Sequence, residues 1–257
     1  MMIWSEGGRN DVAVTVPDQA ALLDDLDRRM AAGQGFSVAT LNLDHVVKLS
    51  QNALFRDAYS AHTHVTADGN PIVWLARLAR QQVSLTPGSE LIEPLAALAA
   101  KNRVPVALFG ATEAALAAAA EALRQRHPGL EIVLCRAPSM SFDPQAPETA
   151  ADIEAIVTSG ARLCFLALGA PKQEIFAARA QASLPSAGFV SIGAGLDFIA
   201  GAQKRAPVWV QRLCVEWLWR LLHNPGRLAA RYAACFYILP ELTGRAWRIR
   251  RQSGVAS

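Results

Sequence analysis

The sequence predicts an α/β fold, in which a parallel sheet carries helices on both faces and a helical appendage follows at the C-terminus. Three observations predict it. Across most of the 257 residues, short apolar and β-branched runs alternate with longer runs of helical periodicity, as in parallel sheets with crossover helices. From Pro207 onward only helical patterns follow. With 52% hydrophobic and 18% charged residues, the chain can fill a sizeable core and is not a disordered chain.

The predicted strands are short and apolar. The first, FSVATLNL at residues 36–43, is rich in β-branched and apolar side chains, which favour extended backbone. The run RLCFLAL at residues 162–168 is apolar almost throughout, as expected of a strand buried on both faces. The other strands are expected at residues 64–67, 104–109, 131–135 and 188–192.

Helices are expected before and between these strands. Ser89 is a candidate N-cap for a helix at residues 89–101. In the C-terminal region, Pro207 suits a first helical position, and Pro225 should end or kink the helix that follows. The remaining helices are expected at residues 20–30, 46–60, 71–82, 113–127, 147–159 and 172–183.

Composition argues against several protein classes. No apolar run approaches the roughly 18 residues of a transmembrane helix. Residues 1–10 lack the apolar stretch of a cleaved signal peptide, so a cytoplasmic protein is expected. The four cysteines form no C-x-x-C pair and are expected to be reduced thiols, and Cys135 and Cys164 lie in strand-like runs where a cysteine is usually buried.

Charge is distributed unevenly along the chain. From Gln203 to the end there are ten basic and two acidic residues, a net charge of +8. Because the whole chain carries +3, residues 1–202 carry −5. Four of the six tryptophans also lie in the C-terminal segment. The asymmetry divides the chain into a body at residues 1–202 and a basic, Trp-rich appendage at residues 203–257, which is expected to meet an anionic surface.

The arginines of the appendage would fall within one stripe of roughly 100° if they lay on a continuous helix. They are Arg205, Arg212, Arg220, Arg227 and Arg231, with Trp209, Trp217 and Trp219 interleaved. Arginine suits phosphates, and tryptophan suits the headgroup layer of a membrane. Two alternatives stay open: an ordinary basic helix packed on the core by its Trp and Leu side chains, and a surface for nucleic acid.

Parallel sheets bind ligands at the carboxyl ends of their strands, so chemistry is expected in the loops that follow the predicted strands. In the first loop, Thr40, Asn42 and Asp44 would share one strand face, because side chains alternate along a strand. Polar side chains buried in an apolar strand need partners, which indicates a polar site. An edge strand with one solvated face would give the same pattern, and spacing alone does not choose between them.

The second loop, ADGNP at residues 67–71, lies between a strand and a helix. Asp68 would stand at the carboxyl edge of the sheet, where a carboxylate can serve as a general base. Gly69 permits a tight turn there. The alternative is an aspartate that merely caps the helix starting near Pro71, and the sequence alone favours this cap.

The third loop, GAPKQE at residues 169–174, follows a very apolar strand. A helix starting at Pro171 would direct free backbone N–H groups toward the loop, and Lys172 would add a full positive charge. This combination predicts an anion site that suits a nucleotide diphosphate.

Gly193 and Gly195 form another close-approach turn after the last predicted strand. They do not complete a G-x-G-x-x-G fingerprint, and none stands near the start of the chain, which argues against a nicotinamide-binding fold.

Two patterns that could suggest a metal site are weaker. Asp25 and Asp27 match a D-x-D motif but lie in a helical stretch, where side chains two residues apart do not face each other. They are expected on a solvated helix face. His62 and His64 alternate on one strand face without a carboxylate or cysteine cluster beside them, so a metal site is not favoured.

Taken together and in order, these motifs resemble the bacterial WecG/TagA/CpsF glycosyltransferase family. The resemblance covers roughly residues 11–231. Seven ordered blocks carry it: TLNLDHV (40–46), ADGNPIVWLAR (67–77), GSELI (88–92), LGAPKQE (168–174), GAGLDFIAG (193–201), KRAPVWVQRL (204–213) and EWLWRLL-x-x-P-x-R (216–227).

The resemblance implies a Rossmann-like fold with an appendage that docks at the membrane, without a D-x-D metal site or a cofactor. It implies inverting transfer of a sugar from a nucleotide donor, usually a UDP-hexose or UDP-N-acetylhexosamine. The implied acceptor is a sugar on a polyprenyl diphosphate lipid at the inner face of the plasma membrane, in cell-surface polysaccharide biosynthesis. Nucleic acid is not an expected partner on this basis.

The resemblance also assigns roles by position. Asp68 corresponds to the proposed catalytic base, and Thr40 and Asn42 to residues lining the acceptor pocket. Arg220 and Arg227 correspond to arginines proposed to grip the lipid diphosphate. The residues expected to bind the donor nucleotide lie on the strand-end loops: Gly169, Lys172, Gln173, Gly193 and Gly195.

One stretch departs from the family pattern. Several members carry an arginine shortly before the GSELI block, whereas residues 83–87 (VSLTP) contain no basic side chain. If that arginine contacts the donor or the leaving group, its role here is lost or has passed to another residue.

Two other classes of function compete with a glycosyltransferase. A nucleotide-sugar epimerase or dehydrogenase could use a similar fold, but the absent dinucleotide fingerprint argues against it. A non-enzymatic membrane or nucleic-acid binder built on the appendage is the other alternative.

Overall fold

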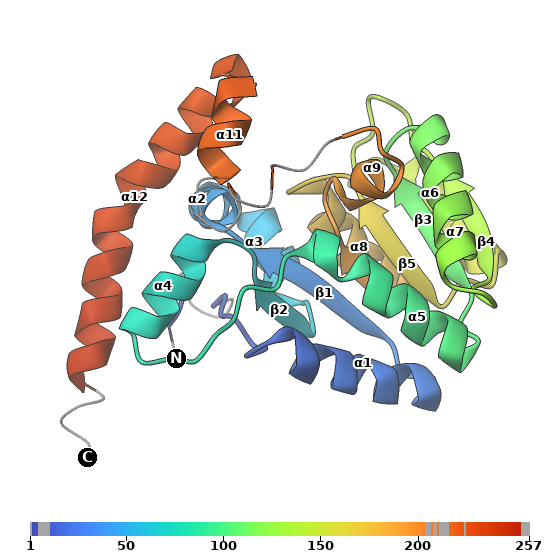
Figure 1. Ribbon diagram of the computed structural model, residues 1–257, viewed down its shortest axis with the longest axis horizontal. Helices are drawn as coiled ribbons and strands as arrows, with labels where there is room; N and C mark the ends of the chain where they lie inside the picture. Colours follow the sequence, from blue (N-terminus) through green and yellow to red (C-terminus); the bar gives the residue numbers. More distant parts are fainter. Residues whose placement is uncertain are drawn as a thin grey trace.

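A six-stranded parallel sheet forms the centre of the protein (Figure 1). The computed structural model describes residues 2–4, 11–203, 207, 210, 216–223 and 225–252. The strands lie in the order β2-β1-β6-β5-β3-β4. Their bounds are β1 Phe36–Leu41, β2 His64–Ala67, β3 Val106–Gly110, β4 Ile132–Arg136, β5 Leu163–Ala167 and β6 Gly188–Ser191.

Helices cover both faces of this sheet, so the predicted fold class, an α/β Rossmann-like arrangement, is confirmed. Side chains alternate across β1, with Val38 in the core on one face and Ala39 in the core on the other. The first face carries α1 Gln19–Ala32, α5 Ile92–Asn102, α6 Glu113–Arg126 and α9 Gly195–Ile199. The second carries α2 Leu43–Gln51, α3 Ala53–Ser60, α4 Asn70–Leu78, α7 Thr149–Thr158 and α8 Lys172–Ser183.

The first strand is shorter than predicted and lies in the interior of the sheet. It ends at Leu41 because Asn42 caps α2, its side-chain oxygen accepting a hydrogen bond from the His45 backbone N–H at 3.0 Å. Asn42 and Asp44 therefore do not share a strand face with Thr40, and that prediction is wrong. The edge-strand alternative is also wrong, since β1 pairs with β2 on one side and β6 on the other.

Two helix predictions need correction as well. The helix expected at residues 46–60 is divided in two, because Asn52 ends α2 and its side chain caps α3 through the Phe55 N–H at 3.0 Å. Ser89 is not an N-cap. It lies inside a 3-10 turn, Gly88–Glu90, and α5 starts only at Ile92. Cys135, expected to be buried, is exposed because its strand β4 forms an edge of the sheet.

The C-terminal region consists of α11 Glu216–His223 and α12 Pro225–Gln252 in the described residues. The helix before Pro225 ends at His223, as predicted, and Pro225 itself begins α12, at a position where its missing N–H costs nothing. The appendage arginines therefore do not lie on one continuous helix. Arg205 and Arg212 lie outside the described residues.

Helix α12 packs along α2 and α4 (Figure 1). Leu242 and Ala246 are buried in the same apolar cluster as Met2 and Trp4 near the N-terminus. No helix in the described part of the chain is both long and apolar enough to cross a membrane.

Candidate active site

The candidate site lies at the carboxyl ends of β1 and β6, two neighbouring strands whose following helices cover opposite faces of the sheet. Helix α2 follows β1 and packs in the core of one face, whereas α9 follows β6 and packs in the core of the other (Figure 1). Such a divergence opens a crevice, which is where open α/β sheets bind their ligands.

Asp68 and Thr40 meet at this edge. Asp68 follows β2, and its backbone N–H donates to the Leu41 carbonyl oxygen at 2.7 Å. The Thr40 hydroxyl lies 3.3 Å from Asp68 Oδ2, to which it donates a hydrogen bond. The predicted cap role of Asp68 is wrong, because Gly69 occupies the N-cap position of α4 with φ 129° and no side-chain cap bond forms. Asp68 is instead held by β1.

Asn42 flanks the same turn. A Cβ atom built on Gly69 would lie 3.8 Å from Asn42 Cβ, so the two loops are in contact. The sheet edge therefore brings together Thr40, Asn42 and Asp68, although Thr40 and Asp68 are 28 residues apart in the sequence. Their assigned roles in the reaction stay predictions.

His45 and Tyr59 are buried beneath this edge, and their contact was not predicted from the sequence. His45 Nδ1 lies 3.1 Å from the Tyr59 hydroxyl, and the ring also hydrogen-bonds the Thr40 backbone. Burial lowers the pKa of His45 to about 3, so the ring is neutral at physiological pH. Burial also raises the pKa of Tyr59, with the nearby Glu174 and Asp68 charges adding to the effect.

The loop after β5 reaches the same edge. Gly169 takes a left-handed conformation with φ 72°, and α8 starts at Lys172, the residue predicted. Lys48 of α2 donates to the Ala170 carbonyl oxygen at 3.1 Å and to Asp44 Oδ2 at 2.7 Å. Lys48 was not singled out from the sequence, because its contact lies 122 residues away along the chain.

Gln173 is buried, and both ends of its amide are occupied. Its oxygen accepts a hydrogen bond from the Gly193 backbone N–H at 3.1 Å, and its nitrogen donates to Glu174 Oε1 at 2.8 Å. Burial raises the pKa of Glu174 to about 7. Gln173 and Gly193, two predicted donor-binding residues, are therefore in direct contact, whereas Glu174 was overlooked within the same motif.

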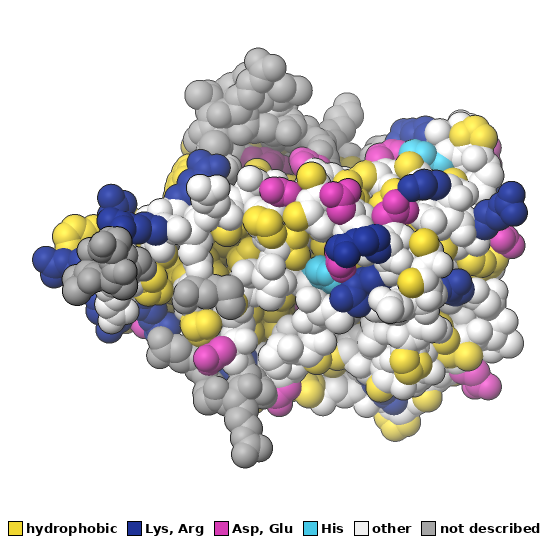
Figure 2. Space-filling view, turned by 90° about the horizontal axis from the view of Figure 1, so that it is seen from below, with side chains coloured by type: hydrophobic (Ala, Val, Ile, Leu, Met, Phe, Trp, Pro, Cys, Tyr) yellow, Lys and Arg dark blue, Asp and Glu magenta, His cyan; other side chains and the backbone are white. Residues whose placement is uncertain are grey.

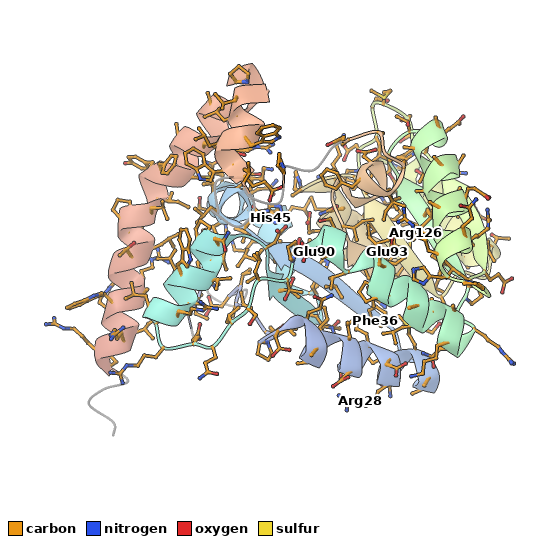
Figure 3. The ribbon with its side chains drawn as sticks, in the orientation of Figure 1. Arg28, Phe36, His45, Glu90, Glu93 and Arg126 are labelled. Carbon is orange, nitrogen blue, oxygen red and sulfur yellow. The ribbon has the colours of Figure 1, made fainter. Side chains whose placement is uncertain are left out.

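A cavity of about 490 Å³ adjoins this turn between α5, α6 and α9. Gly195, the last predicted donor-binding residue, lines it. Figure 3 labels three of the lining residues: Glu90 in the 3-10 turn, Glu93 in the first turn of α5 and Arg126 at the end of α6. The lining residues are Ser89, Glu90, Glu93, Arg126, Gly195, Phe198, Ile199 and Gln203.

The 3-10 turn Gly88–Glu90 lies between this cavity and the Thr40–Asp68 pair. A Cβ atom on Gly88 would lie 3.2 Å from Thr40 Cγ2 and 2.6 Å from the Ser191 carbonyl oxygen. A Cβ atom on Gly195 would lie 3.3 Å from Ser89 Cα. At Gly88 the close backbone oxygen leaves no room for a side chain, whereas at Gly195 the tightest contact is with the flexible end of Ile92, at 2.5 Å.

The appendage is tied to this region by an ion pair. Arg231 Nε of α12 lies 3.4 Å from Asp44 Oδ1, and Asp44 also pairs with Lys48. The side chains of Arg220 and Arg227 lie outside the described part of the structure, so their predicted role stays a prediction.

Aromatic and basic side chains are exposed along the appendage. Trp217 of α11 makes edge contacts with Tyr232 and Phe236 of α12, and Tyr237 is 87% exposed. Figure 2 shows Lys and Arg side chains gathered at the C-terminal end of α12, on the left of the view. The exposed arginines there are Arg248, Arg250 and Arg251.

The two metal-like patterns have structural partners instead. Asp25 pairs with Arg28, Arg29 and His64, whereas Asp27 pairs with Lys101 and Asn102. His62 hydrogen-bonds the Ala58 carbonyl oxygen. Within the described residues, no three His, Cys, Asp or Glu side chains gather so that they could hold a metal ion.

Comparison with protein families identifies the family of this chain. The chain matches the model of the Glycosyl transferase WecG/TagA/CpsF family over residues 10–254, nearly its whole length. The ordered motifs, the parallel sheet and the polar strand-end loops agree with this match. The chain belongs to the WecG/TagA/CpsF family of glycosyltransferases.

Proposed function

We propose that this glycosyltransferase moves a hexose-type sugar from a nucleotide donor, a UDP-hexose or UDP-N-acetylhexosamine, to a sugar on a polyprenyl diphosphate lipid. The reaction takes place at the inner face of the plasma membrane and serves cell-surface polysaccharide biosynthesis. The observation that carries the proposal is the Thr40–Asp68 hydrogen bond at the carboxyl edge of the sheet, beside a cavity of about 490 Å³.

Asp68 acts as the general base. Its carboxylate accepts the proton of the acceptor hydroxyl, whose oxygen forms a bond to the anomeric carbon of the donor sugar. The bond from that carbon to the nucleotide diphosphate breaks on the opposite face, so the configuration inverts and the nucleoside diphosphate leaves with the bonding electrons. The Thr40 hydroxyl supports this role because it fixes one carboxylate oxygen of Asp68.

The donor lies against the loops after β5 and β6. Lys172 and the N-terminal N–H groups of α8 stabilise the charge of the leaving diphosphate, with Gly169 and Gly193 allowing close approach of the backbone. Glu90 and Gln203 in the cavity supply acceptors for sugar or ribose hydroxyl groups, and Phe198 supplies an apolar surface.

The acceptor approaches from the appendage side. Thr40 and Asn42 line its sugar pocket, and Arg220 and Arg227 bind its diphosphate, for which the arginine fork is well suited. The exposed Trp247 and the neighbouring arginines of α12 support docking on an anionic membrane surface.

A donor screen tests this proposal. Purified full-length protein is incubated with a synthetic polyprenyl-diphosphate-linked sugar and each of several nucleotide sugars, and released nucleoside diphosphate is measured. We expect release with a UDP-sugar only when the lipid acceptor is present. Acceptor-independent release, or release from none of the donors, would refute the proposed reaction.

A further inference from the structure

The first turn of α8 buries two polar side chains that the reaction scheme leaves without an explained role. Glu174 has no exposed surface and Gln173 is 2% exposed. Burying a carboxyl group is costly unless its hydrogen bonds are satisfied. Only Glu174 Oε1 is satisfied, by Gln173 Nε2 at 2.8 Å, and Oε2 has no hydrogen-bond partner in the part of the chain that is described. An apolar side chain would fill this position at lower cost, so the carboxyl group needs another explanation.

That explanation lies in the orientation of the Gln173 amide. An amide side chain can present either its oxygen or its nitrogen to a neighbour. Only the oxygen can accept the Gly193 N–H, at 3.1 Å. Glu174 Oε1 is an acceptor on the other side, so it holds the nitrogen and leaves the oxygen for Gly193. Without Glu174, neither of these contacts would keep the amide oxygen of Gln173 turned toward the Gly193 N–H.

The strut formed by Glu174, Gln173 and the Gly193 N–H supports the turn after β6. Gly193 has φ 55°, and its peptide N–H points back at α8 rather than along the sheet. Two residues later, Gly195 lines the cavity and lies against Ser89 and Ile92. The orientation of the Gln173 amide therefore determines the position of the Gly193 turn, which lies between the cavity and the loop after β5.

We propose that Glu174 is a positioning residue for the donor site, acting through Gln173 to hold the Gly193 turn where the nucleotide binds. It touches neither donor nor acceptor. The inference rests on the proposed function for the identity of the ligand, but the strut itself does not depend on it.

The test compares two substitutions of Glu174. Glu174→Leu removes the acceptor and fills a similar volume, whereas Glu174→Gln keeps an oxygen that can accept from Gln173 Nε2. The first readout is hydrogen–deuterium exchange of the Gly193 amide, resolved to the residue by fragmentation mass spectrometry. The second is the Kd of UDP measured by calorimetry. Loss of one hydrogen bond predicts roughly tenfold faster exchange and roughly tenfold weaker binding for Glu174→Leu, with both restored in Glu174→Gln.

Ile156→Ala is the matched control. Ile156 is buried on α7 in the same apolar cluster as Phe176 and Ala177 of α8, and it takes part in neither hydrogen bond of the strut. Ile156→Ala weakens the packing of α7 against α8 but leaves the hydrogen bonds of the Gln173 amide in place. Gly193 exchange under native conditions and UDP binding should therefore stay near wild type. If Glu174→Leu fails to fold, Glu174→Met takes its place with the same expectation.

The outcomes separate the two proposals. Unchanged Gly193 exchange in the Leu or Met variant overturns the strut, and faster exchange with an unchanged UDP Kd overturns the positioning role. If Glu174→Gln also loses slow Gly193 exchange and UDP affinity, the positioning role is overturned, because an acceptor for Gln173 Nε2 is then not enough to hold the turn. If the wild-type protein binds no UDP, the proposed uridine donor fails, and Gly193 exchange alone decides the strut.

Discussion

At the scale of single residues, the Thr40 hydroxyl determines where the Asp68 carboxylate lies. A carboxylate that capped α4 would be committed to the helix, whereas Asp68 is fixed by the Thr40 hydroxyl at 3.3 Å and remains at the strand edge. General base catalysis needs such a group within reach of the hydroxyl that it deprotonates.

Replacing Asp68 by Asn tests this role directly. Asn keeps the size and can still accept from Thr40, but it cannot take a proton, so turnover should fall by about 10²–10⁴. Released nucleoside diphosphate measures turnover, and the thermal unfolding midpoint should stay near wild type. Asp24→Asn, an exposed position on α1, is the control and should change neither. Near-normal turnover in Asp68→Asn would remove Asp68 from the base role.

Glu174 gives a pH prediction at the same scale. Burial raises its pKa from 4.5 to about 7, against the lowering effects of its Gln173 hydrogen bond and the Lys48 charge. The folded state therefore holds the proton more tightly than the unfolded state. Below pH 4.5 the group is protonated in both states and does not lower the free energy of unfolding. As pH rises from 4.5 to 7 this free energy falls, and above pH 7 it is lower by about 3 kcal/mol.

Glu174→Gln removes this titration. The free energy of unfolding, measured by urea denaturation, should favour the variant over wild type by more at pH 8 than at pH 5, by up to about 3 kcal/mol. Tyr59 and Lys48 face Glu174 in both proteins, so their contributions largely cancel in this difference. Exposed Glu154→Gln is the control. If the free energy of unfolding changed with pH by the same amount in wild type and in Glu174→Gln, the prediction would be contradicted.

Among the elements, the 3-10 turn Gly88–Glu90 has the most demanding position. It lies on the carboxyl ends of β1 and β6 and separates the Thr40–Asp68 pair from the cavity. Its fit depends on the absence of a side chain at Gly88, where a Cβ atom would stand 2.6 Å from a backbone oxygen of β6.

Gly88→Ala should therefore displace the turn. Overpacking of this kind costs about 1–3 kcal/mol of stability, and a shift of about 1 Å at a reacting site can lower turnover about 10²-fold. Urea denaturation and the diphosphate-release assay measure the two effects. Gly244→Ala in α12 is the matched control, because a Cβ atom there meets nothing within 4 Å. It should leave turnover unchanged and stabilise the helix by up to about 1 kcal/mol. Equal turnover in both variants would show that the turn tolerates displacement.

For the molecule as a whole, α12 belongs to the core as well as to the surface. Leu242 and Ala246 are buried with residues near the N-terminus, while Phe236, Tyr237 and Trp247 face outward. Deleting the chain after Gly201 should abolish activity, but the deletion also uncovers this apolar cluster. Substitutions on the outer face of α12 are therefore a cleaner test of membrane docking.

Vesicle pelleting provides that test. Full-length protein should bind vesicles containing phosphatidylglycerol, and binding should weaken with added salt. Replacing Arg248, Arg250 and Arg251 together by Gln should lower the partition coefficient about 10²-fold, since each basic residue at an anionic surface contributes about 1 kcal/mol. The matched control replaces Arg28, Lys101 and Arg103, exposed cations elsewhere on the body. An equal loss in both variants would indicate general electrostatic attraction rather than docking through α12.

The sequence by itself determined the order and type of most elements. Hydrophobic periodicity and turn residues are local, and they placed β2 and α8 at their observed bounds and all six strands in the right order. Motif order also identified the family, since those blocks are read along the chain.

Only the tertiary structure decided how these elements share their polar groups. Asn42 could extend a strand or cap a helix, and Asp68 could cap a helix or lie against β1; the choice depends on which N–H or hydroxyl stands nearby after folding. Lys48 meets Ala170 across 122 residues, and Gln173 meets Gly193 across the α8–β6 connection. A buried polar group is stable only with a partner, and strand order, which no local pattern encodes, determines which partners come within reach.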